Sequence, residues 1–404
     1  MRKKVLFVIN TLGHAGAETA LLELLANMDP GKYEVFLYVL MGQGELLKRL
    51  PAHVKLLNKE YSNASVLSED GKANMRRTVM KAAMHKGNVL RLMPYLMKNA
   101  IERMRHGKLY VDKLLWRVLS DGAPKIPMTF DLAVAYLEGG SAYYVADHVK
   151  AVKKAAFIHI DYSRAGYTRE LDQNCYLRYD RIFTVSKEVK EHFLRAYPEC
   201  VPFTEVFHNL INQETIRSRA KEAGGFTDDY DGIRLLTVGR LTSQKAYEIA
   251  IEAMALLKQD GYKARWYILG EGKLRRELEE QIRRRCLEED FILLGADGNP
   301  FPYYKQCDIY VHATRFEGKS IAIQEAQTLG CAIIASDCSG NREQIIQNVD
   351  GVLCPLTPEG IRDSIEYYID NPQIRTEFGN KAVQKEIVHR EELQMLLQLL
   401  GEEK

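Results

Sequence analysis

The chain has 404 residues, too many for a single ordinary core, so two domains are expected. Its 46% hydrophobic and 27% charged residues are typical of a globular protein and argue against a disordered, fibrous or membrane-spanning chain. The formal net charge of only +2 argues against a globally basic nucleic-acid binder, so nucleic acid is not an expected partner.

The seven cysteines are odd in number and include no C-x-x-C pair. This usage is typical of reduced thiols in the cytoplasm and indicates neither a disulfide framework nor a zinc site. The apolar run Val5–Ile9 ends at Asn10, too early for the core of a signal peptide, and no stretch approaches the length of a membrane span. We therefore expect a cytoplasmic protein, which can still lie peripherally on the inner face of the cell membrane.

Short apolar runs alternate with helical periodicity along the chain, as in parallel sheets covered by helices. In the first half, the expected strands are Val5–Ile9, Val35–Leu40, Leu132–Ala135, Ala156–His159, Arg181–Val185 and Glu205–Phe207. The helices expected between them include Ala17–Met28 and Lys187–Ala196. The pattern predicts a first Rossmann-like domain over residues 1–212.

A second series of strands follows the first. Its expected strands are Arg234–Val238, Arg265–Leu269, Phe291–Leu294, Ile309–Val311, Ala332–Ala335 and Gly351–Leu353, and its expected helices are Tyr247–Lys258, Leu274–Arg285, Ser320–Leu329 and Ile361–Ile369. Between the two series, residues 218–232 contain a Gly-Gly pair and an acidic run that bury nothing, which marks a domain boundary. We expect a second domain over 213–375 and a C-terminal helical tail, 376–404, that packs back across the domains.

A basic helical segment, residues 72–119, interrupts the first series. Lys72–Arg117 holds twelve Lys or Arg against two acids, with six of the twelve methionines. Between Val89 and Met104, apolar residues recur at helical spacing, which predicts basic amphipathic helices. These helices either pack on their own domain with a solvated basic face or, over residues 72–117, form a surface for anionic lipid or an anionic acceptor.

The first expected strand leads into Gly13-His-Ala-Gly16 and then into a helix. The two glycines let a ligand approach the backbone, and the free N–H groups of the helix face the same place. The spacing is G-x-x-G, whereas dinucleotide-binding proteins have G-x-G-x-x-G, so an NAD site is weakly supported. A tight turn without a ligand is the alternative.

Two cations follow the first strand of the second series. Arg240 comes directly after Val238-Gly239, and Lys245 stands just before a helix. The helix dipole disfavours a positive charge at that end, so its placement suggests an anion nearby, most simply a phosphate or diphosphate. The alternative is a pair of solvated surface cations.

Two acids frame the helix expected at Ser320–Leu329. Glu317 lies in the loop before it, and Glu325 comes eight residues later, which is about two turns and places it on roughly the same face. Gly318-Lys319-Ser320 supplies a cap and open amides for phosphate. A carboxylate at Glu325 can accept hydrogen bonds from vicinal hydroxyls, as Rossmann acids do from ribose; a partly buried structural acid is the alternative.

Together these residues resemble the family-4 retaining glycosyltransferases with the GT-B fold, of the bacterial type that builds cell-surface polysaccharide or glycolipid. The matching residues are Gly13, Gly16-Ala-Glu18, His159, Gly239-Arg240, Lys245, Phe316-Glu317-Gly318, Glu325, Gly340-Asn-Arg-Glu343 and Asp350-Gly351. The resemblance covers nearly the full chain and is strongest in the second half. It implies an α/β fold in which two doubly wound, Rossmann-like parallel-sheet domains face a cleft, with the basic helical insertion in the first.

The implied reaction moves a hexose or N-acetylhexosamine from a nucleoside-diphosphate sugar, a UDP-sugar by preference, to a glycan or a polyprenyl- or lipid-linked acceptor. Arg240 and Lys245 would neutralise the diphosphate, and Glu325 would bind the ribose hydroxyls. The donor sugar would be held by Glu317 and by the amides of Lys319, Ser320 and Ile321.

From the first domain, His159 would reach the donor sugar, and Gly13–Gly16 would approach the phosphates or the acceptor. A lone histidine can equally be a satisfied interior residue. Two positions depart from the family pattern, namely Ala15 in the first loop and Ala246 after the lysine, where glycine is usual. Both alanines are small and leave the backbone route open.

No metal cofactor is expected, because fixed cations and helix-end amides can stabilise the departing diphosphate. The D-x-D sequence Asp229-Tyr-Asp231 lies in the polar linker and is expected to be solvated. No second carboxylate suggests itself as a covalent nucleophile, so same-face attack with retention is the expected mechanism.

Two other classes of function remain open from the sequence. A nucleotide-sugar epimerase or a sugar phosphorylase on the same fold would need a second acid pair or a pyridoxal lysine, neither of which is located. A non-catalytic sugar- or lipid-binding partner of another transferase would have no need of Arg240, Lys245, Glu317 and Glu325 together.

Overall fold

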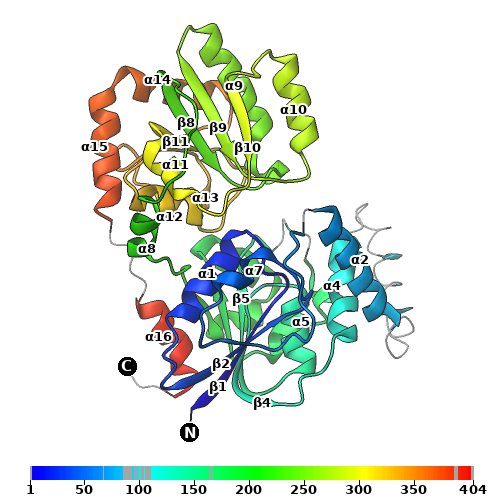
Figure 1. Ribbon diagram of the computed structural model, residues 1–404. Coiled ribbons are helices and arrows are strands. Elements are labelled where there is room, and N and C mark those ends of the chain that lie inside the picture. The colour runs from blue at the N-terminus through cyan, green and yellow to red at the C-terminus, as the bar shows by residue number, and fades with distance from the viewer. Residues whose placement is uncertain are drawn as a thin grey trace. The chain divides into compact units, whose positions relative to one another are not determined.

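The computed structural model describes residues 2–66, 68–84, 93–94, 97, 100–101, 104, 111–162, 165, 167–385 and 390–401. Two compact units make up the chain, the first being Met1–Leu210 with His389–Lys404 and the second Ile211–Val388. The first domain expected from the sequence, 1–212, ends two residues after the observed division at Leu210. Within each unit, helices cover both faces of a sheet (Figure 1).

The first unit contains a seven-stranded parallel sheet with the order β3-β2-β1-β4-β5-β6-β7. The strands are β1 (Lys3–Ile9), β2 (Tyr33–Val39), β3 (Lys55–Leu56), β4 (Thr129–Ala135), β5 (Lys150–Ile158), β6 (Arg181–Thr184) and β7 (Thr204–Val206). The α-helices are α1 (Gly16–Ala26), α2 (Glu69–Met84), α4 (Val111–Gly122), α5 (Gly140–His148), α6 (Arg169–Asp172), α7 (Lys187–Ala196) and α16 (Arg390–Gln398). In the described part of this unit, the 3-10 helices are η1 (Glu45–Arg49), η3 (Cys175–Arg178) and η4 (Pro198–Phe203).

The second unit contains a six-stranded parallel sheet with the order β10-β9-β8-β11-β12-β13. The strands are β8 (Ile233–Val238), β9 (Ala264–Leu269), β10 (Phe291–Gly295), β11 (Ile309–His312), β12 (Ala332–Ser336) and β13 (Val352–Cys354). The helices are α8 (Gln213–Arg219), η5 (Ser243–Lys245), α9 (Tyr247–Gln259), α10 (Arg275–Arg284), α11 (Phe301–Gln306), α12 (Ile321–Thr328), α13 (Ser339–Arg342), α14 (Pro358–Asp370) and α15 (Pro372–Val383).

Both sheets are buried on their two faces, which explains why their strands are continuous apolar runs in the sequence. Along β1, Leu6 and Val8 enter one core while Val5 and Phe7 enter the other. A fully buried side chain of this size contributes roughly 1.5–3 kcal/mol, so a slip of one residue is strongly disfavoured. All twelve strands expected from the sequence are present; β3, only two residues long, was not expected because two residues show no periodicity.

The expected tail, 376–404, is divided between the two units. Phe378 of α15 packs into a core of the second unit, whereas Leu396 and Leu397 of α16 pack into a core of the first. The first part of the tail therefore belongs to the second domain, beyond the expected end at 375. Helical periodicity shows that a helix has an apolar face but not which core covers that face.

Helices α2 and α4 of the basic insertion lie side by side (Figure 1). A Cβ at Gly122 would lie 2.4 Å from the carbonyl oxygen of Ala82, so the glycine allows the close approach of the two helices. Most of the helix expected between Val89 and Met104 lies outside the described residues. Among the helices that are described, none has both the length and the apolar character needed to cross a bilayer.

Candidate functional site

Two loops at the carboxyl edge of the second sheet are joined by hydrogen bonds. They follow β8 and β11, which are neighbours in the sheet. The backbone N–H of Arg315 donates to the carbonyl of Gln244 at 2.8 Å, and the Gln244 side-chain amide donates to the carbonyl of Phe316 at 2.9 Å. Thr314 Oγ1 donates to the same Gln244 carbonyl at 3.1 Å. These bonds fix the position of the next residue, Lys245, relative to the loop that contains Glu317.

Lys245, Glu317 and His312 form a buried polar cluster at this edge. Lys245 Nζ lies 2.5 Å from Glu317 Oε2, and both side chains are 14% exposed. His312, the last residue of β11 and 1% exposed, places Nε2 at 3.1 Å from the same carboxylate oxygen and 3.4 Å from Lys245 Nζ. Lysine and glutamate are rarely buried unless paired, and here they are paired.

The neighbours of Glu317 keep it ionised. Burial alone would raise the pKa of the Glu317 carboxyl, but the charge of Lys245 and the hydrogen bond with His312 outweigh it and lower the pKa to about 2. Burial and the charge of Lys245 lower the pKa of His312, so its ring is neutral at pH 7. The cluster thus has one cation, one anion and one neutral ring.

Arg240, the other expected cation, is exposed after the end of β8. Among the residues that the structure describes, no carboxylate forms an ion pair with its guanidinium. The residue before it, Gly239, accepts a hydrogen bond from Tyr247 Oη at 2.8 Å through its carbonyl. The loop after β8 therefore presents one unpaired and one paired cation at the same sheet edge.

The predicted amides lie at the N-terminal end of α12. Ser320 is the N-cap, with its hydroxyl accepting from the N–H of Ile323 at 3.4 Å. The first N–H groups of any helix have no partner within it, so the amides of Ser320 and Ile321 stand at an end that favours anions, and Lys319 directly precedes this end. A Cβ at Gly340 would lie 2.2 Å from the Gly318 carbonyl oxygen, so this glycine allows α13 to approach the loop.

Glu325 lies one to two turns into α12 and is half-buried. Its Oε2 accepts a hydrogen bond from Tyr304 Oη at 3.0 Å. The carboxylate is thus paired as a structural acid would be, and the binding of hydroxyl groups stays a prediction, so both interpretations from the sequence stay open.

In the first unit, His159 follows β5 directly and is a neutral residue among aromatic rings. Burial lowers the pKa of its imidazole to about 3, and the ring lies 5.1 Å from that of Tyr136 and 6.0 Å from that of Phe157. Its backbone N–H donates to Glu138 Oε2 at 3.0 Å. Its Nε2 is buried with no hydrogen-bond partner among the described residues, whereas a hydrogen bond with the Tyr136 backbone raises the pKa of the ring, so both interpretations of this histidine stay open.

The first loop is a tight turn at the start of α1. The N–H of Ala15 donates to the Gly13 carbonyl at 2.9 Å, and Gly16 is the first residue of the helix. Ala15 has an extended backbone with φ −145°, which any residue adopts, so alanine fits in place of the family's glycine. Ala246 differs, because its φ of 47° lies in the left-handed region that favours glycine.

The sequence did not predict His312, Tyr310 or Tyr304. The expected strand at residues 309–311 stopped one residue short of His312; it included Tyr310 without giving it a role, and Tyr304 was not singled out. A histidine at the end of an otherwise apolar strand was the available signal. Its partners Tyr310 and Glu317 lie two and five residues away, whereas Lys245 is 67 residues away and could not be identified from a local pattern.

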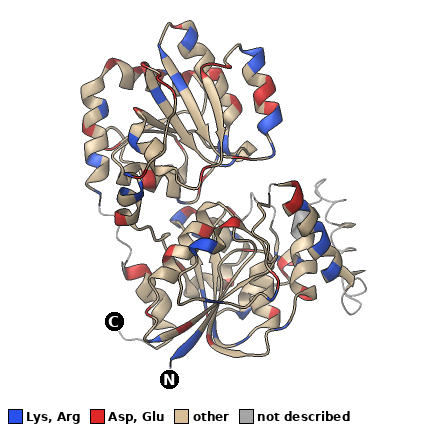
Figure 2. Cartoon of the chain, viewed as in Figure 1, with Lys and Arg blue, Asp and Glu red and all other residues tan. Residues whose placement is uncertain are grey.

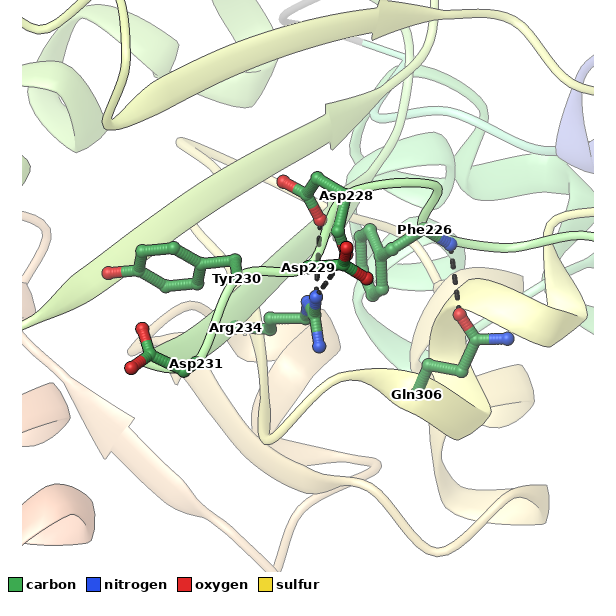
Figure 3. A pocket seen from close by; sticks show the side chains of 7 residues that line it. All are labelled: Phe226, Asp228, Asp229, Tyr230, Asp231, Arg234 and Gln306. Atoms are coloured by element: carbon green, nitrogen blue, oxygen red, sulfur yellow. Dashed lines mark hydrogen bonds and ion pairs between the residues drawn. The ribbon is translucent and has the colours of Figure 1, made fainter.

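The acidic linker lines a pocket (Figure 3), in which Asp229 and Asp231 are exposed, as expected, whereas Asp228 is half-buried. Asp228 pairs with Arg234 at 3.2 Å and with Arg265 at 2.7 Å, and accepts from Tyr267 Oη at 2.6 Å. These contacts attach the linker to the second sheet. Of the linker's acids, Asp231 is exposed and pairs with Lys263. In the described part of the chain, no group of three or more His, Cys, Asp or Glu side chains could hold a metal ion.

Part of the chain is similar to a known protein family. Residues 221–385 match the family model described as "Glycosyl transferases group 1". The Lys245–Glu317–His312 cluster, the Ser320 cap and Glu325 all lie inside the matched residues.

Two curated relatives match parts of the chain. The N-acetylgalactosamine-N,N'-diacetylbacillosaminyl-diphospho-undecaprenol 4-alpha-N-acetylgalactosaminyltransferase of Campylobacter jejuni is 32% identical over 209 residues, covering 51% of this chain and 55% of the relative. The alpha-D-kanosaminyltransferase of Streptomyces kanamyceticus is 30% identical over 152 residues, covering 37% of this chain and 39% of the relative. The chain thus matches about half, or less, of the length of these relatives.

The fold is similar to solved structures over its whole length. Anabaena HepE in complex with UDP and glucose has a TM-score of 0.67 and 15% sequence identity, covering 100% of both chains. At this identity the likeness shows the fold alone. With the two parallel sheets of seven and six strands, it confirms the GT-B fold predicted from the sequence.

Proposed function

We propose that the protein is a retaining, metal-independent glycosyltransferase that moves a hexose or N-acetylhexosamine from a UDP-sugar to a glycan or lipid-linked acceptor. The observation that supports this most is the buried Lys245–Glu317–His312 cluster beside the N-terminal end of α12. A cluster of one fixed cation and one fixed anion next to open helix amides suits a ligand with both phosphate and hydroxyl groups.

In this proposal, the positive groups stabilise the leaving group. As the glycosidic bond breaks, negative charge develops on the diphosphate and the sugar becomes oxocarbenium-like. Lys245 and Arg240 offset the negative charge, and they cost no reorganisation because the hydrogen bonds between the two loops already hold the backbone beside Lys245. Glu325 receives the ribose hydroxyls, and the donor sugar is held by Glu317 and by the amides of Lys319, Ser320 and Ile321.

The first unit contributes His159 and the Gly13–Gly16 turn to the reaction. A neutral imidazole with an unpartnered, buried Nε2 can accept or donate a hydrogen bond to a sugar hydroxyl without adding charge. In this proposal, the backbone of the turn binds the phosphates or the acceptor.

Two comparisons support the substrate classes. The fold is shared with proteins solved with UDP and with UDP-glucose, and the name of the Campylobacter relative includes a diphospho-undecaprenol acceptor. The test is a panel of nucleoside-diphosphate sugars, with release of nucleoside diphosphate measured by mass spectrometry. A transferase releases it; isomerised sugar without release would instead indicate an epimerase, and no response to any nucleotide would indicate a binding partner.

Metal independence follows from the same electrostatics. If Lys245, Arg240 and the α12 amides stabilise the negative charge of the departing diphosphate, a divalent cation is not needed for this purpose. We expect unchanged donor turnover in excess EDTA. Loss of turnover that Mg²⁺ or Mn²⁺ restores would contradict this part of the proposal.

We propose further that the basic helix α2 attaches the protein to the cytoplasmic face of an anionic membrane. Figure 2 shows Lys and Arg spaced along this helix. Arg76, Arg77 and Lys81 are exposed, and the same face exposes Met80 (61%) and Met84 (71%), while Val79 faces the core. Each cation near an anionic leaflet contributes about 1 kcal/mol, and exposed methionines add apolar contact.

Vesicle sedimentation tests the membrane proposal. The protein is expected to pellet with anionic vesicles at low salt and to be released by salt, because surface charges are screened. Changing Arg76, Arg77 and Lys81 to Ser should abolish pelleting. A matched control changes three exposed cations of the second unit, Arg283, Arg284 and Lys305, to Ser. Equal, negligible pelleting with anionic and neutral vesicles would contradict the proposal.

A further inference from the structure

His312 is a buried histidine whose two ring nitrogens both have partners in the same unit. Its Nδ1 lies 3.0 Å from Tyr310 Oη, and its Nε2 lies 3.1 Å from Glu317 Oε2 and 3.4 Å from Lys245 Nζ. A leucine would fill an apolar strand end at lower cost, because burying an imidazole requires hydrogen bonds that compensate for lost water. The partners are therefore informative about its role.

The chemistry of the partners fixes the proton of the neutral ring. An ionised carboxylate only accepts, so His312 Nε2, 3.1 Å from Glu317 Oε2, donates to it, as Lys245 does; an Nε2 that bears the hydrogen cannot also accept from Lys245. Nε2 must then bear the hydrogen, which leaves Nδ1 as the acceptor for the hydroxyl of Tyr310. Tyr310 thus holds the ring in the tautomer that donates to the glutamate.

The chain of polar groups continues toward the other acid of the site. The ring of Tyr310 lies 5.1 Å from that of Tyr304, and Tyr304 donates to Glu325. The tyrosines are buried, so their rotamers are restricted by packing. Glu317 and Glu325 are therefore each held by a side chain from a separate element that packs beneath α12.

We propose that His312 is a positioning residue that holds Glu317 in place when Lys245 binds the donor diphosphate. This inference rests on the proposed function of Lys245. A phosphate that pairs with Lys245 weakens the ion pair between Lys245 and Glu317. The buried carboxylate of Glu317 would then face the negative charge of the phosphate. A neutral donor keeps that carboxylate fixed without changing the net charge of the site.

The experiment measures UDP affinity of the full-length protein by calorimetry for wild type, His312→Leu, His312→Gln and Tyr310→Phe. Loss of a hydrogen bond to a charged group predicts about tenfold weaker UDP binding by His312→Leu. Glutamine places an amide donor near the Nε2 position, so His312→Gln should recover part of the affinity. Tyr310→Phe keeps the ring and should weaken binding by about threefold, because the tautomer is no longer fixed.

A double-mutant cycle separates positioning from packing. In a Glu317→Gln background, the His312→Leu substitution should no longer weaken UDP binding, whereas a loss due only to core packing would persist. Wild-type UDP affinity in folded His312→Leu and Tyr310→Phe overturns the inference. If His312→Leu does not fold, His312→Gln and Tyr310→Phe decide alone. Failure of the wild type to bind UDP, ADP or GDP would instead contradict the proposed function.

Discussion

At the carboxyl edges of the two sheets, buried ionisable groups have opposite charge states: one is neutral and the other is charged. At the edge of the first sheet, His159 lies among aromatic rings, and burial lowers its pKa to about 3, so it is uncharged. At the edge of the second sheet, Glu317 is also buried, yet Lys245 lowers its pKa to about 2, so it keeps its charge. The difference shows that burial alone does not decide the charge of a site residue; the nearest partner does.

The largest effect is expected when a cation at the carboxyl edge of the second sheet is removed. Lys245→Met and Arg240→Ala should each lower kcat/KM about a hundredfold, the usual cost of removing one positioned charge from a developing anion. The matched control is Lys258→Met, since Lys258 lies in the same unit and pairs with Asp290 at 2.5 Å but is 52% exposed. Wild-type turnover in a folded Lys245→Met protein would show that the second edge is not the diphosphate site.

A smaller effect is expected at the uncharged first edge. His159→Ala should lower kcat about tenfold or more, as for a group that hydrogen-bonds the reacting sugar, while UDP affinity stays unchanged because the nucleotide is assigned to the other unit. The readout is kcat and, separately, the Kd for UDP. If His159→Ala weakens UDP binding as much as Lys245→Met does, the division of roles between the two edges is wrong.

The two units should also differ in the pH dependence of their stability. Burial raises the pKa of Asp172 in the first unit to about 6, although Tyr143 and Tyr162 donate hydrogen bonds to it. The folded protein favours the protonated form of Asp172. The contribution of Asp172 to the free energy of unfolding is therefore fully present below its unfolded pKa of 3.8 and is lost as the pH rises through 6. The contribution of Glu317 to the free energy of unfolding is present above pH 4.5 and is lost only as the pH falls toward 2.

The difference in the free energy of unfolding between wild type and each variant, obtained from the shift in unfolding midpoint, measures these contributions. Between pH 4.5 and 7.5, this free-energy difference should fall by about 2 kcal/mol for Asp172→Asn and should stay constant for Glu317→Gln. Below pH 4.5 the Glu317→Gln difference should shrink. Parallel curves for the two variants would contradict the contrast between the units.

The smallest expected effect concerns the backbone that leads from Lys245 into α9. Ala246 has φ 47°, and glycine relieves that strain but gains freedom in the unfolded chain. Ala246→Gly should therefore change stability by less than about 1 kcal/mol and leave turnover unchanged. The control is Ala15→Gly, where φ is −145° and no strain is relieved, so a net loss is expected. Thermal unfolding of both variants compares the two turns.

Much of the fold could be predicted because its signals are local. Apolar runs predicted the strands of both sheets, and the expected first domain, 1–212, ends two residues after the division at Leu210. Ser320 was recognisable as a helix cap, and Glu317 and Lys245 as loop residues next to helix starts. Residue type and spacing suffice for such features, since each depends on neighbours within one or two turns.

The tertiary structure alone decided which residues meet. Lys245 and Glu317 are 72 residues apart and form a pair because β8 and β11 are adjacent in the sheet, an order set by the packing of all six strands and their helices. The same adjacency brings His312 of β11 to Lys245, and the cores decide that α15 and α16 join different units. Sequence periodicity determines which face of an element is buried, but strand order and long-range packing determine which charges share a site.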